Sequence, residues 1–126
     1  LFLFSSFEIS FVFFFLFSLL FKTRNIMDKY EILLYPKAYQ DIDDIYSYIA
    51  FEKLSPENAR AQTDRIWDAI ESLQFQPASH QDRLVGRYAN SGYKQLIIDN
   101  YIAIFKIDHV GNKVYVITVQ YQGRNV

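Results

Sequence analysis

The last third of the chain, residues 93–124, limits the fold more than any other stretch, because it holds three runs of β-forming residues separated by turns. The runs are residues 93–98, 101–107 and 114–121. Asp99-Asn100 supplies a two-residue turn, and residues 108–112 supply a longer one that contains Gly. These features predict a three-stranded antiparallel meander. A sheet of this size leaves one apolar face in water, so the upstream chain must cover it.

The upstream chain predicts one short strand and two helices. Residues 29–35 form a strand-like run that Pro36 ends. Apolar residues then recur at helical spacing to about Lys53, and a second helix is expected from Ser55-Pro56, a favourable start, to about Gln76. The expected core stripes are Ala38, Ile42, Ile45 and Ile49 in the first helix and Ala59, Ile66, Ile70 and Leu73 in the second. Asp41, Asp43 and Asp44 are expected on the solvent side of the first helix.

The order of these elements predicts an α+β fold. A strand is followed by a helical hairpin and then by a three- to four-stranded, mainly antiparallel sheet, with the hairpin laid over one face. Residues 78–92 are expected to be loop, with Leu84-Val85 as the place where a further short strand fits.

Composition excludes several classes of function. The 126 residues suffice for about one domain. The chain has no cysteine, which excludes a disulfide framework and a thiolate site. His80 and His109 both fall in predicted loops, so neither a metal centre nor a Ser/His pair is expected. The glycines are scattered as turn residues and form no phosphate-binding loop. We expect no metal and no organic cofactor.

Charge is divided unevenly along the chain. Residues 27–76 carry five Lys/Arg and ten Asp/Glu, a net charge of −5, whereas residues 77–126 carry six Lys/Arg and three Asp/Glu, a net charge of +3. The excess of cations in the second half mildly favours an anionic partner for the later strands, against the alternative of ordinary solvated charge.

The first 26 residues differ from the rest. Residues 1–21 are mostly Phe, Leu, Ser and Ile, and Lys22 and Arg24 follow. The run is just long enough for a membrane span of about 20 residues, and a span would leave the domain on the cytoplasmic side. It fits a secretory signal poorly, since no cations precede it. Because Met27 stands directly before the first strand, we favour an upstream in-frame stretch outside the natural protein. The expected division is a hydrophobic extension, 1–26, and a domain, 27–126.

The two-residue turn also predicts which side chains share a face of the sheet. The expected pairs are Ile98 with Tyr101, Ile97 with Ile102, Gln95 with Ile104 and Tyr93 with Lys106. One face then carries Gln95, Ile97, Ile102 and Ile104. The other carries Leu96, Ile98, Tyr101, Ala103 and Phe105, and we assign it to the helices. A slip of one residue would exchange the two faces.

Several segments together resemble a known family. They are GYKQLIIDNYIAIFKID at residues 92–108, VYVITV at 114–119, YQGRN at 121–125 and YQDIDDIYSYI at 39–49. In this order they are similar to the RelE/ParE toxins of bacterial type II toxin–antitoxin systems. The resemblance covers nearly all of residues 27–126 and none of 1–26. It implies the fold described above, a cytoplasmic protein, and a cognate antitoxin as partner.

The resemblance leaves the target to be decided between two branches. Ribonuclease members cut mRNA in the ribosomal A site with Lys and Arg on the sheet, and ParE-type members poison DNA gyrase. Here Ile97 and Ile102 stand at positions that are often Arg or Lys in the ribonuclease branch, and near the C-terminus only Arg124 matches that family's arginine pair. Two Ile cannot stabilise a developing phosphate charge. We therefore expect a ParE-like toxin that acts on DNA gyrase.

Two alternatives stay open beside this expectation. One is a ribosome-dependent mRNA endoribonuclease of the RelE type. The other is a non-toxic, degenerate member that serves as a binding module, or as a membrane-tethered adaptor if residues 1–26 belong to the protein.

The candidate site residues fall into two groups, and no catalytic residue is assigned. The candidates for an anion-contacting surface are Arg83, Arg87, Lys94, Arg124 and, as an aromatic at a strand end, Tyr121. The candidates for antitoxin contact are Ile97, Ile102 and Ile104, expected as an exposed apolar patch, and Trp67 beside the stripe of the second helix.

Overall fold

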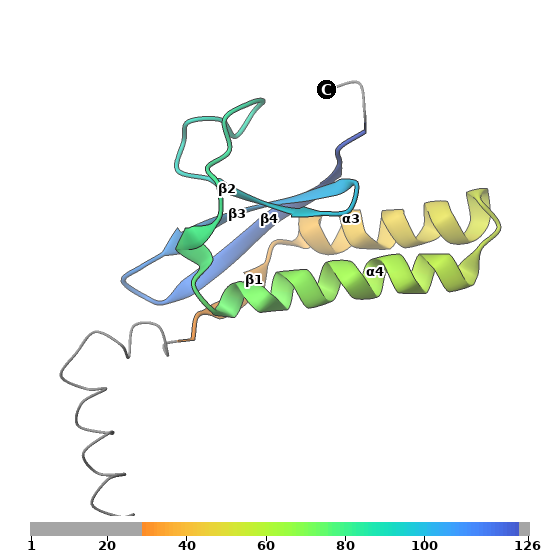
Figure 1. The fold of residues 1–126 in the computed structure, drawn as a ribbon, viewed down its shortest axis with the longest axis horizontal. Helices are drawn as coiled ribbons and strands as arrows, with labels where there is room; N and C mark the ends of the chain where they lie inside the picture. The colour runs from red at the N-terminus through yellow and green to blue at the C-terminus, as the bar shows by residue number, and fades with distance from the viewer. Residues whose placement is uncertain (1–28, 124–126) are drawn as a thin grey trace, which may run out of the picture.

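Two helices lie against one face of a four-stranded sheet (Figure 1). The computed structural model describes residues 29–123. The strands are β1 (Glu31–Leu34), β2 (Lys94–Ile98), β3 (Tyr101–Asp108) and β4 (Lys113–Tyr121), and the helices are α3 (Pro36–Ser47) and α4 (Pro56–Glu71). The sheet order is β1-β4-β3-β2, with β1 parallel to β4 and the other pairs antiparallel. The predicted α+β architecture is confirmed.

The predicted register of the first hairpin is also confirmed. Ile98 pairs with Tyr101, Ile97 with Ile102 and Gln95 with Ile104. Asp99 at the turn has a φ of 55°, the left-handed conformation that Asp and Asn tolerate in tight hairpins. The face predicted to meet the helices joins the core through Leu96, Ile98, Tyr101, Ala103 and Phe105.

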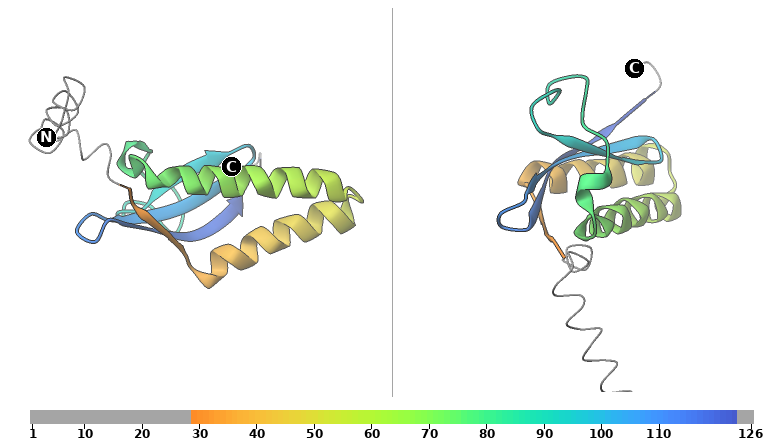
Figure 2. Two further views of the ribbon diagram at one scale, coloured as in Figure 1. Left: turned by 90° about the horizontal axis from the view of Figure 1, so that it is seen from below. Right: turned by 60° about the vertical axis from the view of Figure 1, so that its left-hand side comes forward.

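The core lies between this helix-facing side of the sheet and the two helices, which both lie on that side in Figure 2. Ile66 and Phe105 are fully buried, and Ile42 and Ile70 are nearly so. Burying a side chain of this size contributes about 1.5–3 kcal/mol. The predicted stripe of the second helix is confirmed, since all four of its members are buried, whereas Ile45 and Ile49 in the first are half-buried.

Asp41 corrects the expectation that the acidic residues of the first helix all face solvent. β1 pairs with β4 only as far as Val116, so the edge of β4 beyond it lacks a strand partner. Asp41 Oδ2 accepts the backbone N–H of Val119 at 3.0 Å and the hydroxyl of the buried Thr118. Its Oδ1 lies 2.9 Å from Lys37 Nζ, and its side chain is 13% exposed. Asp41 therefore replaces the missing strand at the edge of β4.

The helix ends differ from the expected boundaries. The first helix closes with a π-helical turn, Tyr48–Glu52, and the second continues as a 3-10 turn, Ser72–Gln74. A further 3-10 turn, Pro77–Ser79, follows. Such turns satisfy end groups that the regular helix leaves free.

The expectation of a short strand at Leu84-Val85 is wrong. Both residues lie in a loop and are 68% and 61% exposed, and only Asp82 makes an isolated bridge, to Lys94. The loop closes on itself through backbone bonds from the Arg83 N–H to the Tyr93 carbonyl and from the Asn90 N–H to the Arg83 carbonyl. Because Gly86 has a φ of 80°, the chain turns away before a strand can extend.

Within residues 29–123, no helix is long and apolar enough to cross a membrane. The hydrophobic run that we singled out, residues 1–26, lies outside the described residues, so the proposed division of the chain at Met27 stays a prediction.

Candidate functional site

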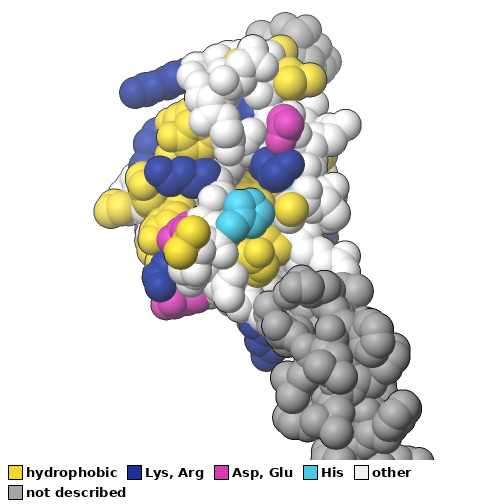
Figure 3. Space-filling model, turned by 90° about the vertical axis from the view of Figure 1, so that its left-hand side faces the viewer, with side chains coloured by type: hydrophobic (Ala, Val, Ile, Leu, Met, Phe, Trp, Pro, Cys, Tyr) yellow, Lys and Arg dark blue, Asp and Glu magenta, His cyan; other side chains and the backbone are white. Residues whose placement is uncertain are grey.

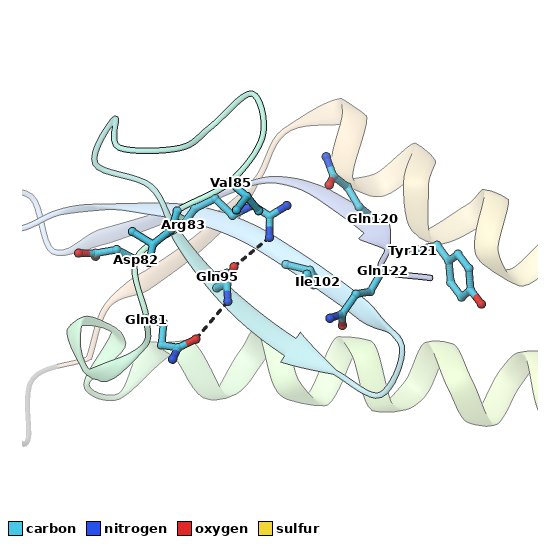
Figure 4. Close-up of a pocket in the computed structure, with 10 residues that line it drawn as sticks. Gln81, Asp82, Arg83, Val85, Gln95, Ile102, Gln120, Tyr121 and Gln122 are labelled. Carbon is cyan, nitrogen blue, oxygen red and sulfur yellow. Dashed lines mark hydrogen bonds between the residues drawn. The ribbon is translucent and has the colours of Figure 1, made fainter. Parts of the chain in front are cut away.

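The face of the sheet away from the helices holds an open groove of about 640 Å³ (Figure 4). The loop that follows α4 forms one wall, and the strands form the floor. The lining residues are Gln81, Asp82, Arg83, Leu84, Val85, Gln95, Ile102, Gln120, Tyr121 and Gln122. Amide side chains dominate the polar part of this surface.

A chain of hydrogen bonds crosses the groove. Arg83 Nη1 donates to Gln95 Oε1 at 2.9 Å, and Gln95 Nε2 donates to Gln81 Oε1 at 3.2 Å, as the dashed lines in Figure 4 show. The backbone supports the same arrangement, because the Gln95 N–H donates to the Gln81 carbonyl at 2.9 Å. Arg83 Nε is buried and has no hydrogen-bond partner among the described residues. The arginine is thus fixed in place with part of its bonding capacity unused.

Lys94 does not belong to this groove, although it was predicted as part of the same anion-contacting surface. It is two residues from Leu96 along the strand, so its side chain shares the helix-facing side of the sheet. Its Nζ lies 3.0 Å from the His80 carbonyl and 2.8 Å from Asp82 Oδ1, and its side chain is 21% exposed. Burial lowers the pKa of His80, and the positive charge of Lys94 lowers it further.

The other predicted anion-contacting residues are spread over the molecule. Tyr121 lines the groove with Arg83, is 63% exposed and contacts the edge of Tyr101, with ring centroids 5.6 Å apart. The Arg87 guanidinium lies 5.8 Å from the Tyr88 ring centroid in the loop. Arg124 lies outside the described residues. Tyr121 borders the groove, but it pairs with the helix-facing Tyr101 and its ring points away from Arg83 in Figure 4. Of the five predicted residues, Arg83 is therefore the one that the described structure places with its side chain at the groove.

The expected patch of exposed isoleucines is largely wrong. Ile97 is 52% exposed, but Ile102 is 5% and Ile104 is 0% exposed. The residues have the predicted orientation, but other chain segments cover two of them. Arg83 and Gln95 hydrogen-bond above this face, and Gln120 pairs with Ile102 across the strands. Only Ile97 of the three presents a large apolar surface.

Trp67 lies on a different surface, beside the helical pair. It is 36% exposed and packs against Tyr39, with ring centroids 5.7 Å apart. A second groove, of about 350 Å³, passes these rings and reaches the edge strand of the sheet. Its lining residues are Ile32, Leu34, Tyr39, Trp67, Ile70 and Glu71.

A row of aromatic rings and one cation crosses the outer face at the opposite end from Ile97. Lys106 Nζ lies 6.0 Å from the ring centroids of both Tyr93 and Tyr115. Figure 3 shows lysine and arginine side chains among hydrophobic ones on this side of the molecule. Cation–π contacts of this kind stabilise the sheet by about 0.5–1 kcal/mol at exposed sites.

Sequence reasoning did not single out the glutamines as a group. Gln81, Gln95, Gln120 and Gln122 are uncharged and follow no functional spacing, and they meet only because the loop folds back over the strands. No group of three or more His, Asp or Glu within residues 29–123 is placed to hold a metal ion.

Comparison with protein-family models identifies one family. The sequence profile described as "ParE toxin of type II toxin-antitoxin system, parDE" matches residues 32–126. No curated protein sequence gives a significant match. Three solved structures are similar to this chain. Because their sequence identity is low, the similarity shows a shared fold.

The structure of the chromosomal ParDE system from P. aeruginosa has a TM-score of 0.62 at 19% identity and covers 75% of this chain and 98% of that one. The RelBE2 complex from Mycobacterium tuberculosis has a TM-score of 0.51 at 20% identity, with 75% and 93% covered. The archaeal RelE–RelB complex from Pyrococcus horikoshii has a TM-score of 0.52 at 12% identity, with 76% and 98% covered. With the profile match spanning most of its length, the chain belongs to the ParE toxin family of type II toxin–antitoxin systems.

Proposed function

We propose that this toxin arrests growth by acting on DNA gyrase and that a cognate antitoxin neutralises it. The observation that carries the choice of target is the lack of a cation cluster in the outer-face groove. Arg83 is the one Lys or Arg among the described lining residues, and the neighbouring positions hold Ile102 and glutamines.

The chemistry of RNA cleavage explains why this matters. A ribonuclease must hold a phosphodiester, stabilise the charge that develops on it and move protons. Lys94 is on the other side of the sheet and is paired with Asp82. His80 lies at the same end, half-buried against the ring of Phe105 at a centroid distance of 5.9 Å. Within residues 29–123 the groove therefore has neither a cation cluster nor an acid–base pair, which supports a target reached by binding.

One observation favours the alternative of a ribosome-dependent endoribonuclease. The row of Tyr93, Lys106 and Tyr115 combines stacking surfaces with a cation, a combination used to hold single-stranded nucleic acid. These groups supply affinity for RNA, but one cation is a weak means of stabilising the charge that develops on a reacting phosphate. We therefore rank this function second, ahead of a non-toxic binding module.

The antitoxin is proposed to occupy the groove beside Trp67. An apolar side chain of the antitoxin would pack between Trp67 and Tyr39, and an exposed tryptophan in a groove is the residue type that dominates binding energy at interfaces. Ile97 is the second candidate contact, because it alone of the three outer-face isoleucines is exposed. Unchanged antitoxin affinity in Ile97→Lys would remove Ile97 from this interface.

The target is tested by pulse-labelling DNA and protein synthesis in the minutes after the full chain is induced in a bacterial host. We expect DNA synthesis to fail first, and the purified chain to inhibit gyrase supercoiling. The control is Phe105→Asp, which places a charge in the core and should abolish all toxicity by unfolding the chain. An early halt of protein synthesis, with gyrase unaffected, would instead establish the ribonuclease. A soluble chain that changes neither would favour the binding module.

Both targets lie in the cytoplasm, and we propose that compartment for the toxin. A membrane attachment facing the cytoplasm remains tied to residues 1–26, and comparing fractionation of the full chain with that of residues 27–126 would test it.

A further inference from the structure

The Arg83 groove has a surplus of hydrogen-bond donors. In the chain from Arg83 to Gln95 to Gln81, the oxygen of each glutamine already accepts a bond. Arg83 uses Nη1 for Gln95, and its remaining N–H groups, like the amide nitrogen of Gln81, have no partner assigned within this chain of bonds. A ligand that complements such a surface brings acceptors, and a carboxylate or phosphate oxygen is the strongest of these.

Arg83 also carries an unsatisfied buried group. Its Nε is out of contact with solvent and lacks a hydrogen-bond partner among the described residues. Figure 4 shows its side chain extending over Gln95 at the wall of the groove. A guanidinium that is held rigidly and only partly bonded loses little entropy when it binds an oxyanion, so it is prepared for a ligand.

The rest of the groove favours a carboxylate on a polypeptide over a nucleic-acid backbone. Arg83 and Asp82 leave the groove close to neutral, whereas backbone binding depends on several cations that contact successive phosphates. The rim is apolar and open, since Leu84 and Val85 are 68% and 61% exposed. Amide side chains along the floor can hydrogen-bond to peptide groups of an extended segment.

We infer that the groove binds an extended segment of the toxin's protein target, with a Glu or Asp carboxylate seated on Arg83 and flanking apolar side chains against Leu84 and Val85. This inference rests on the proposed function, because it names the chemistry of the segment that a protein target presents. The antitoxin occupies a different surface in this scheme, the groove beside Trp67.

The test selects short peptides from a random display library on the immobilised full chain, and measures the selected peptides by fluorescence anisotropy. We expect an enriched Glu or Asp flanked by apolar residues. Changing that acid to its amide, or making Arg83→Gln, should weaken binding about ten- to a hundredfold, as for a charge-assisted hydrogen-bonded pair. The two changes together should cost no more than either alone.

Matched variants separate binding from folding. Arg60→Gln removes an exposed arginine of α4 outside the groove and should leave peptide affinity unchanged. Leu84→Ser changes an exposed rim residue, so it should weaken binding severalfold without altering the circular dichroism spectrum. If Arg83→Gln proves unstable, Leu84→Ser keeps the inference testable.

Several results would overturn the inference. Selected peptides that lack an acid, or that bind Arg83→Gln as well as the wild type, would exclude this site, as would failure to select any groove-dependent peptide. Displacement of the peptides by oligo(dT) at lower concentration than by free acidic peptide would make the groove a nucleic-acid site. If the antitoxin displaces the selected peptides and Trp67→Ala abolishes peptide binding, the peptides mimic a segment of the antitoxin and not of the target.

The inference and the proposed function fail separately. If the purified chain inhibits gyrase but the selected peptides bind outside the groove, gyrase is supported as the target and the binding of an acidic segment at Arg83 is excluded. If peptides bind in the groove but the purified chain does not inhibit gyrase, gyrase is excluded as the target and the proposed binding chemistry of the groove still holds. Relief of gyrase inhibition by a selected peptide would support both.

Discussion

The two faces of the sheet are formed by alternate residues of the same strands, yet they differ in what buries them. The inner face, Leu96, Ile98, Tyr101, Ala103 and Phe105, packs against two regular helices. The outer face is covered only in part, by a loop and by hydrogen-bonded polar side chains over Ile102 and Ile104. The inner face therefore provides the stability of the fold, whereas the outer face provides a surface whose chemistry depends on one arginine and its amide neighbours.

The largest effect is expected from Phe105→Ala. Phe105 is fully buried, and truncation removes its transfer free energy and leaves a cavity, at a cost of about 3–5 kcal/mol in the free energy of unfolding. Urea denaturation followed by circular dichroism measures this. Ile97→Ala on the outer face is the matched control and should cost under about 1 kcal/mol, because Ile97 is half exposed. Similar costs for the two would mean that the faces do not differ in this way.

The next effect concerns binding. Trp67→Ala should weaken the complex with the proposed cognate antitoxin by about 2–4 kcal/mol, as expected for an interface tryptophan against which an apolar side chain of the partner packs. Calorimetric titration measures the affinity. Phe51→Ala, which removes another exposed aromatic ring at the tip of the helical hairpin, is the control and should change it little. If antitoxin affinity is unchanged in Trp67→Ala but lost in Ile97→Lys, the interface lies on the outer face of the sheet.

Asp41→Ala tests the edge of β4, where a side chain takes the place of a neighbouring strand. The change leaves the Val119 N–H and the buried Thr118 hydroxyl without their acceptor, so stability should fall by about 1–3 kcal/mol. The loss of the exposed Lys37 partner adds little. Asp43→Ala on the solvent side of the same helix is the control for helix propensity and should lie within about 0.5 kcal/mol of the wild type. Hydrogen exchange at Val119 should accelerate only in the first variant.

The inner face could be predicted from the sequence, because strand alternation, the two-residue turn at Asp99 and the helical spacing of Ile66 and Ile70 are local signals that all agree. The outer face could be predicted only in orientation. Ile104 points where the register requires, but its burial depends on where the loop that carries Arg83 comes to rest.

That loop is positioned by contacts that have no periodic signal in the sequence. Arg83 and Gln95 are twelve residues apart, and their bond depends on the closure of the chain through the Arg83 N–H and the Tyr93 carbonyl. Asp41 was missed for the same reason, since its partner Val119 lies 78 residues away. The candidate site was therefore predicted for Arg83 by residue type, while the glutamines that surround it required the folded chain.

The smallest expected effect is the pH dependence that His80 contributes. Burial and the charge of Lys94 lower its pKa in the folded state below the usual 6.5, so the unfolded chain binds a proton at a pH where the folded chain does not. This contribution to stability is complete above pH 6.5 and is lost as the pH falls from there through the folded-state pKa. Urea midpoints measured from pH 8 to 5 should decline less in His80→Gln than in the wild type. Lys94→Gln, which removes the cation but leaves the histidine, should give an NMR titration of His80 with a higher pKa. If His80 has the same pKa in the wild type and in Lys94→Gln, burial alone lowers that pKa. The carboxylate of Asp82 would then neutralise the effect of the Lys94 charge on His80.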